Sequence, residues 1–217
     1  MSAPILLALP KGRIGEDTLA KLEGTPFALD PEALKGRVLR IPTATPGLEA
    51  LLLKGADLPR YVAGGVAALG VVGSDILEEE PADLLELADL GYSACRLSLC
   101  AKAGVSLDDL RGKAHLRIGT KFPQATARWL AKEELAAELV PLQSSVELAP
   151  LLGLADAIVD LVQTGGTLRA HGLEERAVLA RTSARLVAGR GAYLGDPARI
   201  GPLGRALAEA LGRRMDP

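Results

Sequence analysis

Histidine and cysteine are scarce in this chain of 217 residues, and their scarcity excludes some kinds of site. The only histidines, His115 and His171, do not lie at ligand spacing from the cysteines, so we expect no structural zinc site. The only cysteines, Cys95 and Cys100, lie an odd number of residues apart in an apolar alternating stretch. On a strand they would face opposite sides of the sheet, and we therefore predict no disulfide between them.

Long apolar segments are absent as well. A membrane-spanning helix needs roughly 18 or more consecutive apolar residues, and no segment of the chain meets that requirement. No apolar segment follows a basic N-terminus, so nothing marks the chain for secretion, and we expect a cytoplasmic protein with no membrane partner. The formal net charge of -2 gives no general attraction to a nucleic-acid backbone. Any bound anion must be held by a local site.

The sequence does contain a regular alternation of apolar runs and helical patterns. The apolar runs, bounded by turn residues, predict buried strands at residues 5–9, 38–41, 69–72, 94–101, 116–119, 157–162, 177–180 and 186–188. Helical patterns predict helices at residues 16–22, 58–63, 82–90, 124–135, 146–152 and from about 202 to 213. Alternation of this kind favours an α/β fold with mixed, largely parallel sheets.

The chain is expected to form two lobes with a ligand cleft between them. It would pass from the first lobe to the second near residues 91–93 and return around residues 181–183. The first lobe would then contain residues 1–91 and 181–217, and the second would contain residues 92–180. A cleft between two lobes is a common place for a ligand.

Segment 156–168 carries the clearest chemical signal. A predicted strand bears Asp156 and Asp160, four residues apart, and ends in a glycine loop before a helical pattern. The loop has the sequence Thr164-Gly165-Gly166-Thr167. Two glycines allow backbone N–H groups to turn toward a phosphate, and a following helix N-terminus adds partial positive charge. A carboxylate beside this cradle would accept hydrogen bonds from sugar hydroxyls. The alternative is an ordinary Thr-Gly-Gly turn, with Asp156 a surface residue at the strand start.

A basic turn follows the first predicted strand. Lys11 and Arg13 flank Gly12 immediately before a helical pattern. An ammonium and a guanidinium together suit a triphosphate or pyrophosphate, because the first is a mobile point charge and the second a bidentate fork. The alternative is a solvated basic turn without a ligand.

Four segments in order make the sequence similar to the ATP phosphoribosyltransferase family. They are Ala-Leu-Pro-Lys-Gly-Arg at 8–13, Gly-Val-Val-Gly-Ser-Asp at 70–75, Arg-Ile-Gly-Thr-Lys-Phe-Pro at 117–123, and Asp-Ala-Ile-Val-Asp-Leu-Val-Gln-Thr-Gly-Gly-Thr-Leu at 156–168. The resemblance extends over nearly the whole chain. It implies a two-lobed fold like that of type II periplasmic binding proteins, and transfer of a phosphoribosyl group from phosphoribosyl pyrophosphate to N1 of ATP, the first step of histidine biosynthesis.

The resemblance also implies roles for particular residues. Phosphoribosyl pyrophosphate would be held by loop 164–167 and Asp160, with Glu147 and Asp156 beside it. ATP would contact Lys11, Gly12, Arg13, Gly73, Ser74 and Asp75. Of these residues, Lys11, Arg13 and Asp160 are the candidates for catalysis. Mg²⁺ is expected through the pyrophosphate of the substrate, with no metal ligands assigned to the protein.

The length of the chain resembles the short form of this family, which lacks a C-terminal histidine-binding domain. The resemblance therefore implies a separate regulatory subunit similar to histidyl-tRNA synthetase, and a homo-oligomer within a hetero-oligomer. Two other functions stay open at this point. One is a solute-binding protein that closes on an anion without chemistry, and the other is a phosphoribosyltransferase that acts on a free nucleobase.

Overall fold

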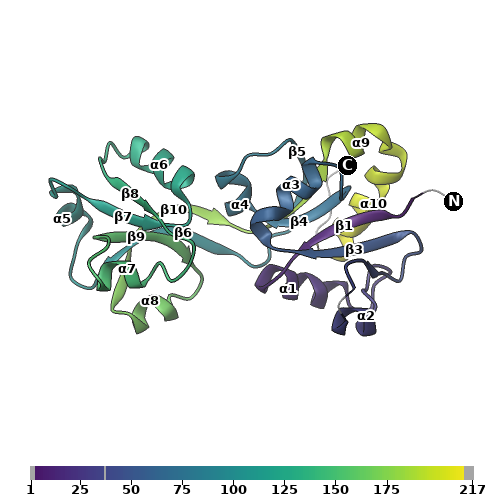
Figure 1. Cartoon of the computed structure of the whole chain (residues 1–217), viewed down its shortest axis with the longest axis horizontal. Coiled ribbons are helices and arrows are strands. Elements are labelled where there is room, and N and C mark those ends of the chain that lie inside the picture. The colour runs from purple at the N-terminus through teal and green to yellow at the C-terminus, as the bar shows by residue number, and fades with distance from the viewer. Residues whose placement is uncertain (1–2, 37, 213–217) are drawn as a thin grey trace. The chain divides into compact units, whose positions relative to one another are not determined.

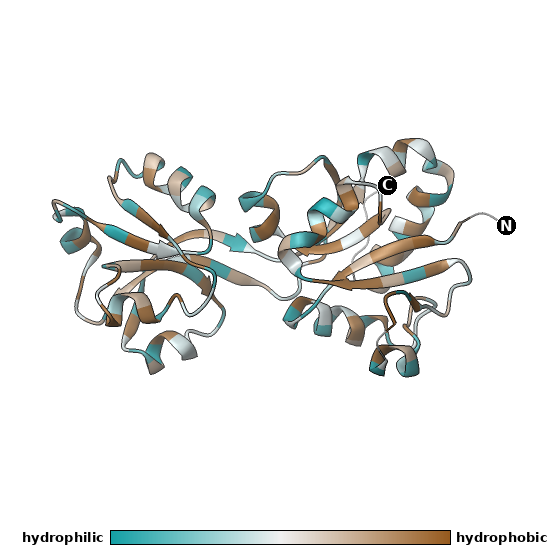
Figure 2. Ribbon diagram, viewed as in Figure 1, coloured by the Kyte–Doolittle hydropathy of each residue, from teal (hydrophilic) through white to brown (hydrophobic). Residues whose placement is uncertain are grey.

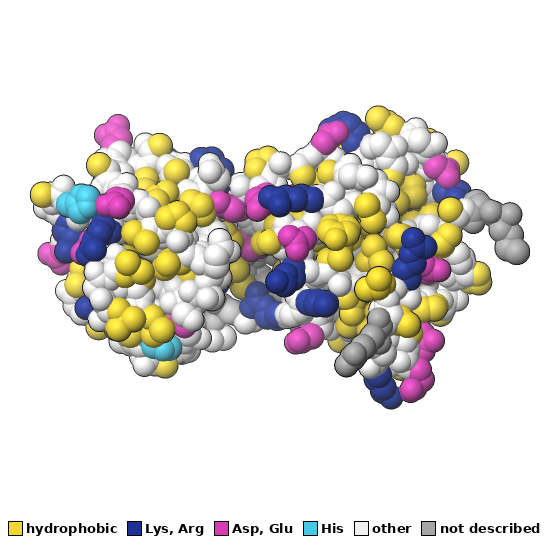
Figure 3. Space-filling model, viewed as in Figure 1, with side chains coloured by type: hydrophobic (Ala, Val, Ile, Leu, Met, Phe, Trp, Pro, Cys, Tyr) yellow, Lys and Arg dark blue, Asp and Glu magenta, His cyan; other side chains and the backbone are white. Residues whose placement is uncertain are grey.

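The computed structural model describes residues 3–36 and 38–212, which form two compact units (Figure 1). Unit 1 contains the chain up to Ser93 together with the part from Ser183 onward, and unit 2 contains Ala94–Thr182. In the described part of the chain, no helix is long and apolar enough to cross a membrane. Figure 3 shows acidic and basic side chains interspersed over the face in view.

Unit 1 is built on a six-stranded mixed sheet with the order β2-β3-β1-β4-β11-β5. The strands are β1 (Ile5–Pro10), β2 (Ile41–Pro42), β3 (Leu48–Leu53), β4 (Leu69–Gly73), β5 (Leu84–Asp89) and β11 (Ala184–Gly189). Strand β1 pairs in parallel with β3 and β4, whereas β11 runs antiparallel to β4 and β5. Because β1 and β4 are parallel neighbours, their carboxyl ends meet at one edge of this sheet.

Helices cover both faces of the unit 1 sheet. They are α1 (Arg13–Leu22), α2 (Pro31–Lys35), α3 (Leu58–Ala63), α4 (Ser74–Glu79), α9 (Arg190–Gly195) and α10 (Pro197–Ala210), with a short 3-10 helix η1 (Gly55–Asp57). Alternate residues of β1 enter different cores. Leu7 and Leu9 pack with α1 and α10, and Leu6 and Ala8 pack with α3. The helix expected at residues 202–213 is confirmed as part of α10, and Arg213 lies outside the described residues.

Unit 2 is built on a five-stranded mixed sheet with the order β10-β6-β9-β7-β8. The strands are β6 (Cys95–Lys102), β7 (Arg117–Thr120), β8 (Glu138–Pro141), β9 (Ala157–Val162) and β10 (Leu173–Thr182). The helices are α5 (Leu107–Arg111), α6 (Pro123–Lys132), α7 (Leu148–Leu151) and α8 (Gly166–Ala170). Strand β7 pairs in parallel with β8 and β9, and β6 pairs antiparallel with β9 and β10.

The two faces of the unit 2 sheet carry separate cores. Leu97 and Leu99 of β6 belong to one core, and Cys100 belongs to the other with Ile158, Val162 and Leu168. Cys95 and Cys100 are both buried and are not joined in a disulfide bond, in agreement with the prediction. Apolar residues run along the strands of both units (Figure 2).

The helix predicted at residues 82–90 is wrong, because Leu84–Asp89 forms β5. Leucine, alanine and glutamate favour helices, but β5 pairs with β11 from Asp89 opposite Arg185 to Leu84 opposite Gly189. Its register with β11 places Glu86 where it forms an ion pair of 2.7 Å with Arg185. Tertiary pairing with a neighbouring strand therefore decides the conformation of a segment whose local pattern suits a helix.

The strand predicted at residues 38–41 is also wrong for most of its length. Only Ile41 belongs to a strand, the two-residue β2, and Val38 and Leu39 are 53% and 85% exposed. The apolar run predicts a buried strand here, but among the described residues no strand pairs with Val38 or Leu39. The neighbouring strand of the sheet is instead β3, which the apolar-run pattern missed.

Candidate active site

The carboxyl ends of β7 and β9 lie side by side in unit 2, because the two strands are parallel and Thr120 pairs with Val159. The glycine loop (residues 164–167) follows β9, and Lys121 follows β7. Thr120 fixes the turn after β7, since its buried Oγ1 donates to the Val159 carbonyl at 2.9 Å and accepts from the Phe122 N–H at 2.9 Å. This edge brings a glycine loop, a carboxylate and a lysine together.

Gly165 sets the shape of the glycine loop. Its φ of 72° is left-handed, a conformation that favours glycine, and it places Gly165 as the N-cap of α8. Arg169 of α8 braces the loop by donating from Nη1 to the Thr164 carbonyl at 3.1 Å. At Gly166 an added Cβ would meet only Thr164 Oγ1, at 3.7 Å, so the loop leaves open space in front of its backbone.

Asp160 lies on β9 beside this loop, with its side chain only 21% exposed. Burial raises the pKa of Asp160 above its usual range, and Lys121 and the Leu161 N–H oppose that rise. The Oδ1 atom lies 3.7 Å from Lys121 Nζ and accepts from the Leu161 N–H at 2.9 Å. Glu147, the N-cap of α7, is near enough for its negative charge to raise the pKa of Asp160 further. A half-buried carboxylate with a cation at one side is suited to accept hydroxyl hydrogen bonds.

Lys121 was not among the site residues predicted from the sequence. The segment Arg-Ile-Gly-Thr-Lys-Phe-Pro contributed only to the family resemblance. A usable signal was present, because Lys121 directly follows a strand in the same way that the glycine loop follows β9. Parallel pairing of those two strands, which the sequence does not specify, is what places Lys121 against Asp160.

Asp156 lies at the other end of β9 from the glycine loop. Its carboxylate accepts from the Arg117 N–H at 2.9 Å and from Lys113 Nζ at 3.0 Å. Burial alone would raise the pKa of Asp156, but these hydrogen bonds and the charges of Lys113 and Arg117 bring it below the usual range. Six residues of strand separate Asp156 from the loop, which is about 20 Å at 3.3 Å per residue. Asp156 anchors the start of β9 and lies outside the site that we propose.

A second group of predicted residues gathers in unit 1 where β1 and β4 end. Lys11 and Gly12 connect β1 to α1, and the turn at residues 73–75 connects β4 to α4. Gly12 has a φ of 85°, which allows α1 to begin immediately after the strand. Arg13 donates from Nη2 to the Ser93 carbonyl at 3.2 Å, whereas Lys11 is exposed.

The turn at residues 73–75 is buried and tightly built. Asp75 is only 7% exposed, and its carboxylate folds over Gly73, where a Cβ would lie 2.2 Å from Asp75 Oδ1. Burial raises the pKa of Asp75, while its own N–H, the Ile76 N–H and the charge of Arg13 oppose the rise. Ser74 exchanges hydrogen bonds with Ser183, at 3.0 Å from its N–H and 3.3 Å to its Oγ. Arg13 is thus near enough to Asp75 for its charge to act on that carboxylate, and a binding site shared by the two residues stays a prediction.

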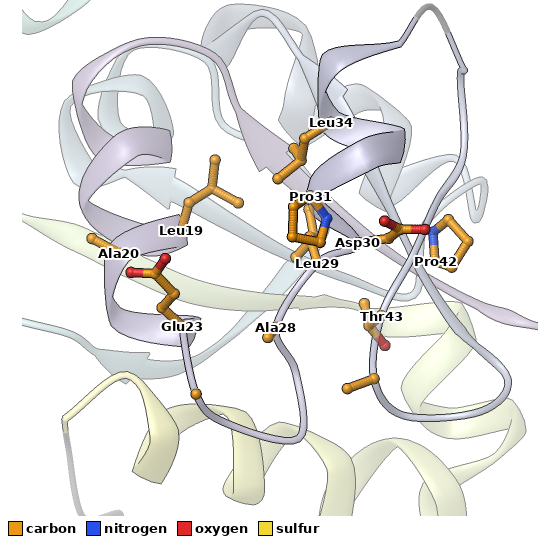
Figure 4. A pocket seen from close by; sticks show the side chains of 12 residues that line it. Leu19, Ala20, Glu23, Ala28, Leu29, Asp30, Pro31, Leu34, Pro42 and Thr43 are labelled. Carbon is orange, nitrogen blue, oxygen red and sulfur yellow. The ribbon is translucent and has the colours of Figure 1, made fainter.

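A pocket of about 660 Å³ lies elsewhere in unit 1 (Figure 4). It is lined by the end of α1, the start of α2 and the segments between and after them, with Leu19, Leu29 and Leu34 among its apolar residues. Glu23 and Asp30 add carboxylates to the lining. None of the residues predicted for substrate binding lines this pocket, so its position gives no support to a role in the chemistry.

The chain is similar to known proteins over nearly its whole length. The model of the ATP phosphoribosyltransferase family (HisG) matches residues 54–209, which is more than half of the chain. The ATP phosphoribosyltransferase of Deinococcus deserti is 46% identical over 209 residues, covering 95% of this chain and 92% of that protein. The chain belongs to the ATP phosphoribosyltransferase family.

Solved structures agree with this assignment. The ATP phosphoribosyl transferase (HisG:HisZ) complex from Thermotoga maritima contains a chain that superposes with a TM-score of 0.81 at 27% identity, covering 95% of this chain and 98% of that one. The periplasmic aliphatic sulphonate binding protein SsuA from Escherichia coli superposes with a TM-score of 0.59 at 15% identity, covering 97% of this chain and 73% of that one. The second likeness confirms that this ATP phosphoribosyltransferase family member has the periplasmic-binding-protein-like fold predicted from its sequence.

Proposed function

We propose that this chain transfers the phosphoribosyl group of phosphoribosyl pyrophosphate to N1 of ATP with release of pyrophosphate, the first step of histidine biosynthesis. The observation that carries the proposal is the juxtaposition of the glycine loop, Asp160 and Lys121 in a chain of this family. A phosphate needs hydrogen-bond donors, and the hydroxyls of a ribose need hydrogen-bond acceptors. At this edge of unit 2 the glycine loop and Lys121 would supply the donors, and Asp160 would supply the acceptor.

The phosphoribosyl donor is assigned to unit 2. The 5′-phosphate would lie against the backbone N–H groups of loop 164–167 and the hydroxyls of Thr164 and Thr167, in the space that the missing side chain of Gly166 leaves open. Asp160 would accept from the ribose hydroxyls, with Glu147 as a second acceptor. The positive charge of Lys121 favours the carboxylate form of Asp160 and so opposes the rise in pKa that burial causes.

ATP is assigned to unit 1, at the edge where β1 and β4 end. Lys11 would bind the triphosphate as a mobile point charge, and Arg13, which donates to the Ser93 carbonyl, would add a second positive charge to the site. The turn of Gly73, Ser74 and Asp75 would complete this site beside Gly12. In this assignment unit 1 would bind ATP, the acceptor of the phosphoribosyl group, and unit 2 would bind phosphoribosyl pyrophosphate, its donor.

Catalysis would depend on orientation and charge rather than on a general base. The adenine N1 is already a nucleophile, so it can displace pyrophosphate from the anomeric carbon without losing a proton first. The main demand on the protein is to stabilise negative charge on the leaving pyrophosphate.

We propose that Mg²⁺ reaches this site together with the pyrophosphate of the substrate. Among residues 3–36 and 38–212, no group of three or more His, Cys, Asp or Glu side chains is arranged to hold a metal ion. Magnesium commonly binds through one or two carboxylates and substrate phosphates, and Asp160 and Glu147 are the carboxylates of unit 2 that could contribute. When bound, the ion would supply positive charge to the pyrophosphate.

The function is tested by mixing the purified chain with ATP, phosphoribosyl pyrophosphate and Mg²⁺ and measuring phosphoribosyl-ATP and pyrophosphate. Formation of both products is expected. Binding without turnover would support a solute-binding protein, and turnover only with a free nucleobase would support the other class of phosphoribosyltransferase.

The enzyme is proposed to act in the cytoplasm, where other biosynthetic enzymes use ATP.

We further expect regulation to reside in a partner subunit. The Thermotoga maritima structure is a HisG:HisZ complex, and by analogy this chain would form a homo-oligomer within a hetero-oligomer with a subunit similar to histidyl-tRNA synthetase. Histidine should then inhibit the complex much more strongly than the isolated chain, because the coupling free energy is shared between the two subunits. Activity is measured against histidine concentration with and without the partner. Equal inhibition of the isolated chain would contradict the assignment.

A further inference from the structure

Two arginines lie in a row across the unit 2 sheet, level with the end of β9. Arg96 of β6 pairs on one side with Arg181 of β10 and on the other with Val162, the last residue of β9. Neighbouring strands are about 4.8 Å apart, so this row leads directly to the glycine loop, which begins two residues after Val162. Neither arginine is among the residues that the family resemblance assigns to the site.

The side chain of Arg96 faces the side of the sheet on which the glycine loop continues. Directly paired residues point to the same face, so Arg96 and Val162 share a face, and Val162 packs with Leu168 of α8 in one core. Ser98 pairs with Asp160 in the same way and lies on that face too. Arg96, Asp160 and α8 therefore occupy one side of unit 2.

Arg96 is held by a carboxylate through one edge of its guanidinium only. Its Nε donates to Glu175 at 3.0 and 3.3 Å, and Glu175 also accepts from Ser98, which is fully buried, at 2.8 Å. A guanidinium has five N–H donors, and in the described part of the chain no hydrogen bond or ion pair is made by the two Nη groups of Arg96. The group is fixed in place with most of its donors available.

Arg96 and Arg181 are like charges directly opposite one another on paired strands. Glu175 offsets part of their repulsion through Arg96, and an anion bound between the two arginines would reduce the rest. We propose that Arg96, together with the exposed Arg181, binds the pyrophosphate group of the phosphoribosyl donor, while the glycine loop holds its 5′-phosphate. Glu175 is a positioning residue that orients Arg96. The identity of the anion rests on the proposed function, whereas the existence of an arginine-built anion site does not.

The test is calorimetric titration of the full-length chain with magnesium pyrophosphate and, separately, with ribose 5-phosphate. Arg96→Ala should weaken pyrophosphate binding roughly tenfold or more, as loss of a charged hydrogen bond does, and leave ribose 5-phosphate binding unchanged. Arg96→Lys should not restore the affinity, because an ammonium cannot bond Glu175 with one edge and present two Nη groups with another. Arg111→Ala is the matched control, since Arg111 belongs to the same unit and pairs with Glu133 at 2.8 Å.

Native pyrophosphate affinity in a folded Arg96→Ala variant would overturn the assignment, and so would loss of ribose 5-phosphate binding in its place. If Arg96→Ala does not fold, Arg181→Ala decides, because Arg181 is exposed and its removal leaves the core intact. Unchanged pyrophosphate affinity there, or no pyrophosphate binding by the wild-type chain, would equally overturn it. Failure of the wild-type chain to make phosphoribosyl-ATP would instead refute the proposed function, and the two failures are thus distinguishable.

Discussion

Replacing Gly166 with valine is expected to abolish the binding of phosphoribosyl pyrophosphate while the protein remains folded. The folded chain has room for the change, because an added Cβ would meet only Thr164 Oγ1 at 3.7 Å. That room is the space in which we place the donor phosphate, and the branched side chain would keep a phosphate away from the loop N–H groups. Calorimetry should detect no donor binding, and the thermal midpoint should stay close to that of the wild-type chain.

The choice of control matters for this experiment. Gly165→Val is unsuitable, because Gly165 has a φ of 72° and a β-branched residue there would strain the backbone of the loop itself. Gly191→Val is matched instead, since an added Cβ would meet no atom within 4 Å beyond its chain neighbours and the backbone of its own helix, and it belongs to unit 1. An unaltered affinity of Gly166→Val for phosphoribosyl pyrophosphate would place the phosphate elsewhere.

Lys11→Ala is expected to weaken the binding of ATP and to leave the binding of phosphoribosyl pyrophosphate unaffected.

The parts of the fold that the sequence predicts correctly are those with strong local patterns. Strand β9 and helix α3 appear with the predicted bounds, because an apolar run between turn residues and a short helical pattern each have one favourable conformation. The leucines, alanine and acidic residues of segment 84–89 fit both the helical and the strand period, and only pairing with β11 selects the strand over the predicted helix. A short stretch of sequence does not show whether it will pair with a strand that is distant in the chain.

The candidate site follows the same rule. The glycine loop and Asp160 are found from the sequence because they are adjacent on one strand and its turn. Lys121 and the proposed Arg96 are missed, since Lys121 follows β7 and Arg96 belongs to β6, and only the strand order β6-β9-β7 brings both next to β9. Asp156 was expected beside the phosphoribosyl donor, but it precedes β9, at the end of the strand far from the glycine loop, and is held by Lys113 and Arg117. The spacing of two residues along a strand indicates whether they share a face of the sheet, but it does not indicate at which end of the strand each of them lies.

Replacing Asp160 with asparagine is expected to lower kcat/KM for phosphoribosyl pyrophosphate by roughly tenfold to a hundredfold, the usual effect of losing hydrogen bonds to a charged group. Stability should not fall. Burial raises the pKa of Asp160 in the folded chain, so the folded state binds a proton more tightly than the unfolded state does. The wild-type chain therefore loses stability as pH rises from the ordinary aspartate range through the raised pKa, and the asparagine variant is free of that loss.

Asp156→Asn is expected to give a result opposite to that of Asp160→Asn. Comparison of the two variants therefore separates effects on catalysis from effects on stability. The pKa of Asp156 is lowered in the folded chain, so its ionised form stabilises the fold at neutral pH, and this contribution is lost as pH falls through the lowered pKa. Asp156→Asn should thus destabilise the chain at pH 7 and leave kcat/KM nearly unchanged. Urea unfolding at pH 3 and pH 7, with kinetics at pH 7, measures both effects. Wild-type kinetics in Asp160→Asn would place the ribose elsewhere, and a larger kinetic loss in Asp156→Asn would exchange the roles of the two carboxylates.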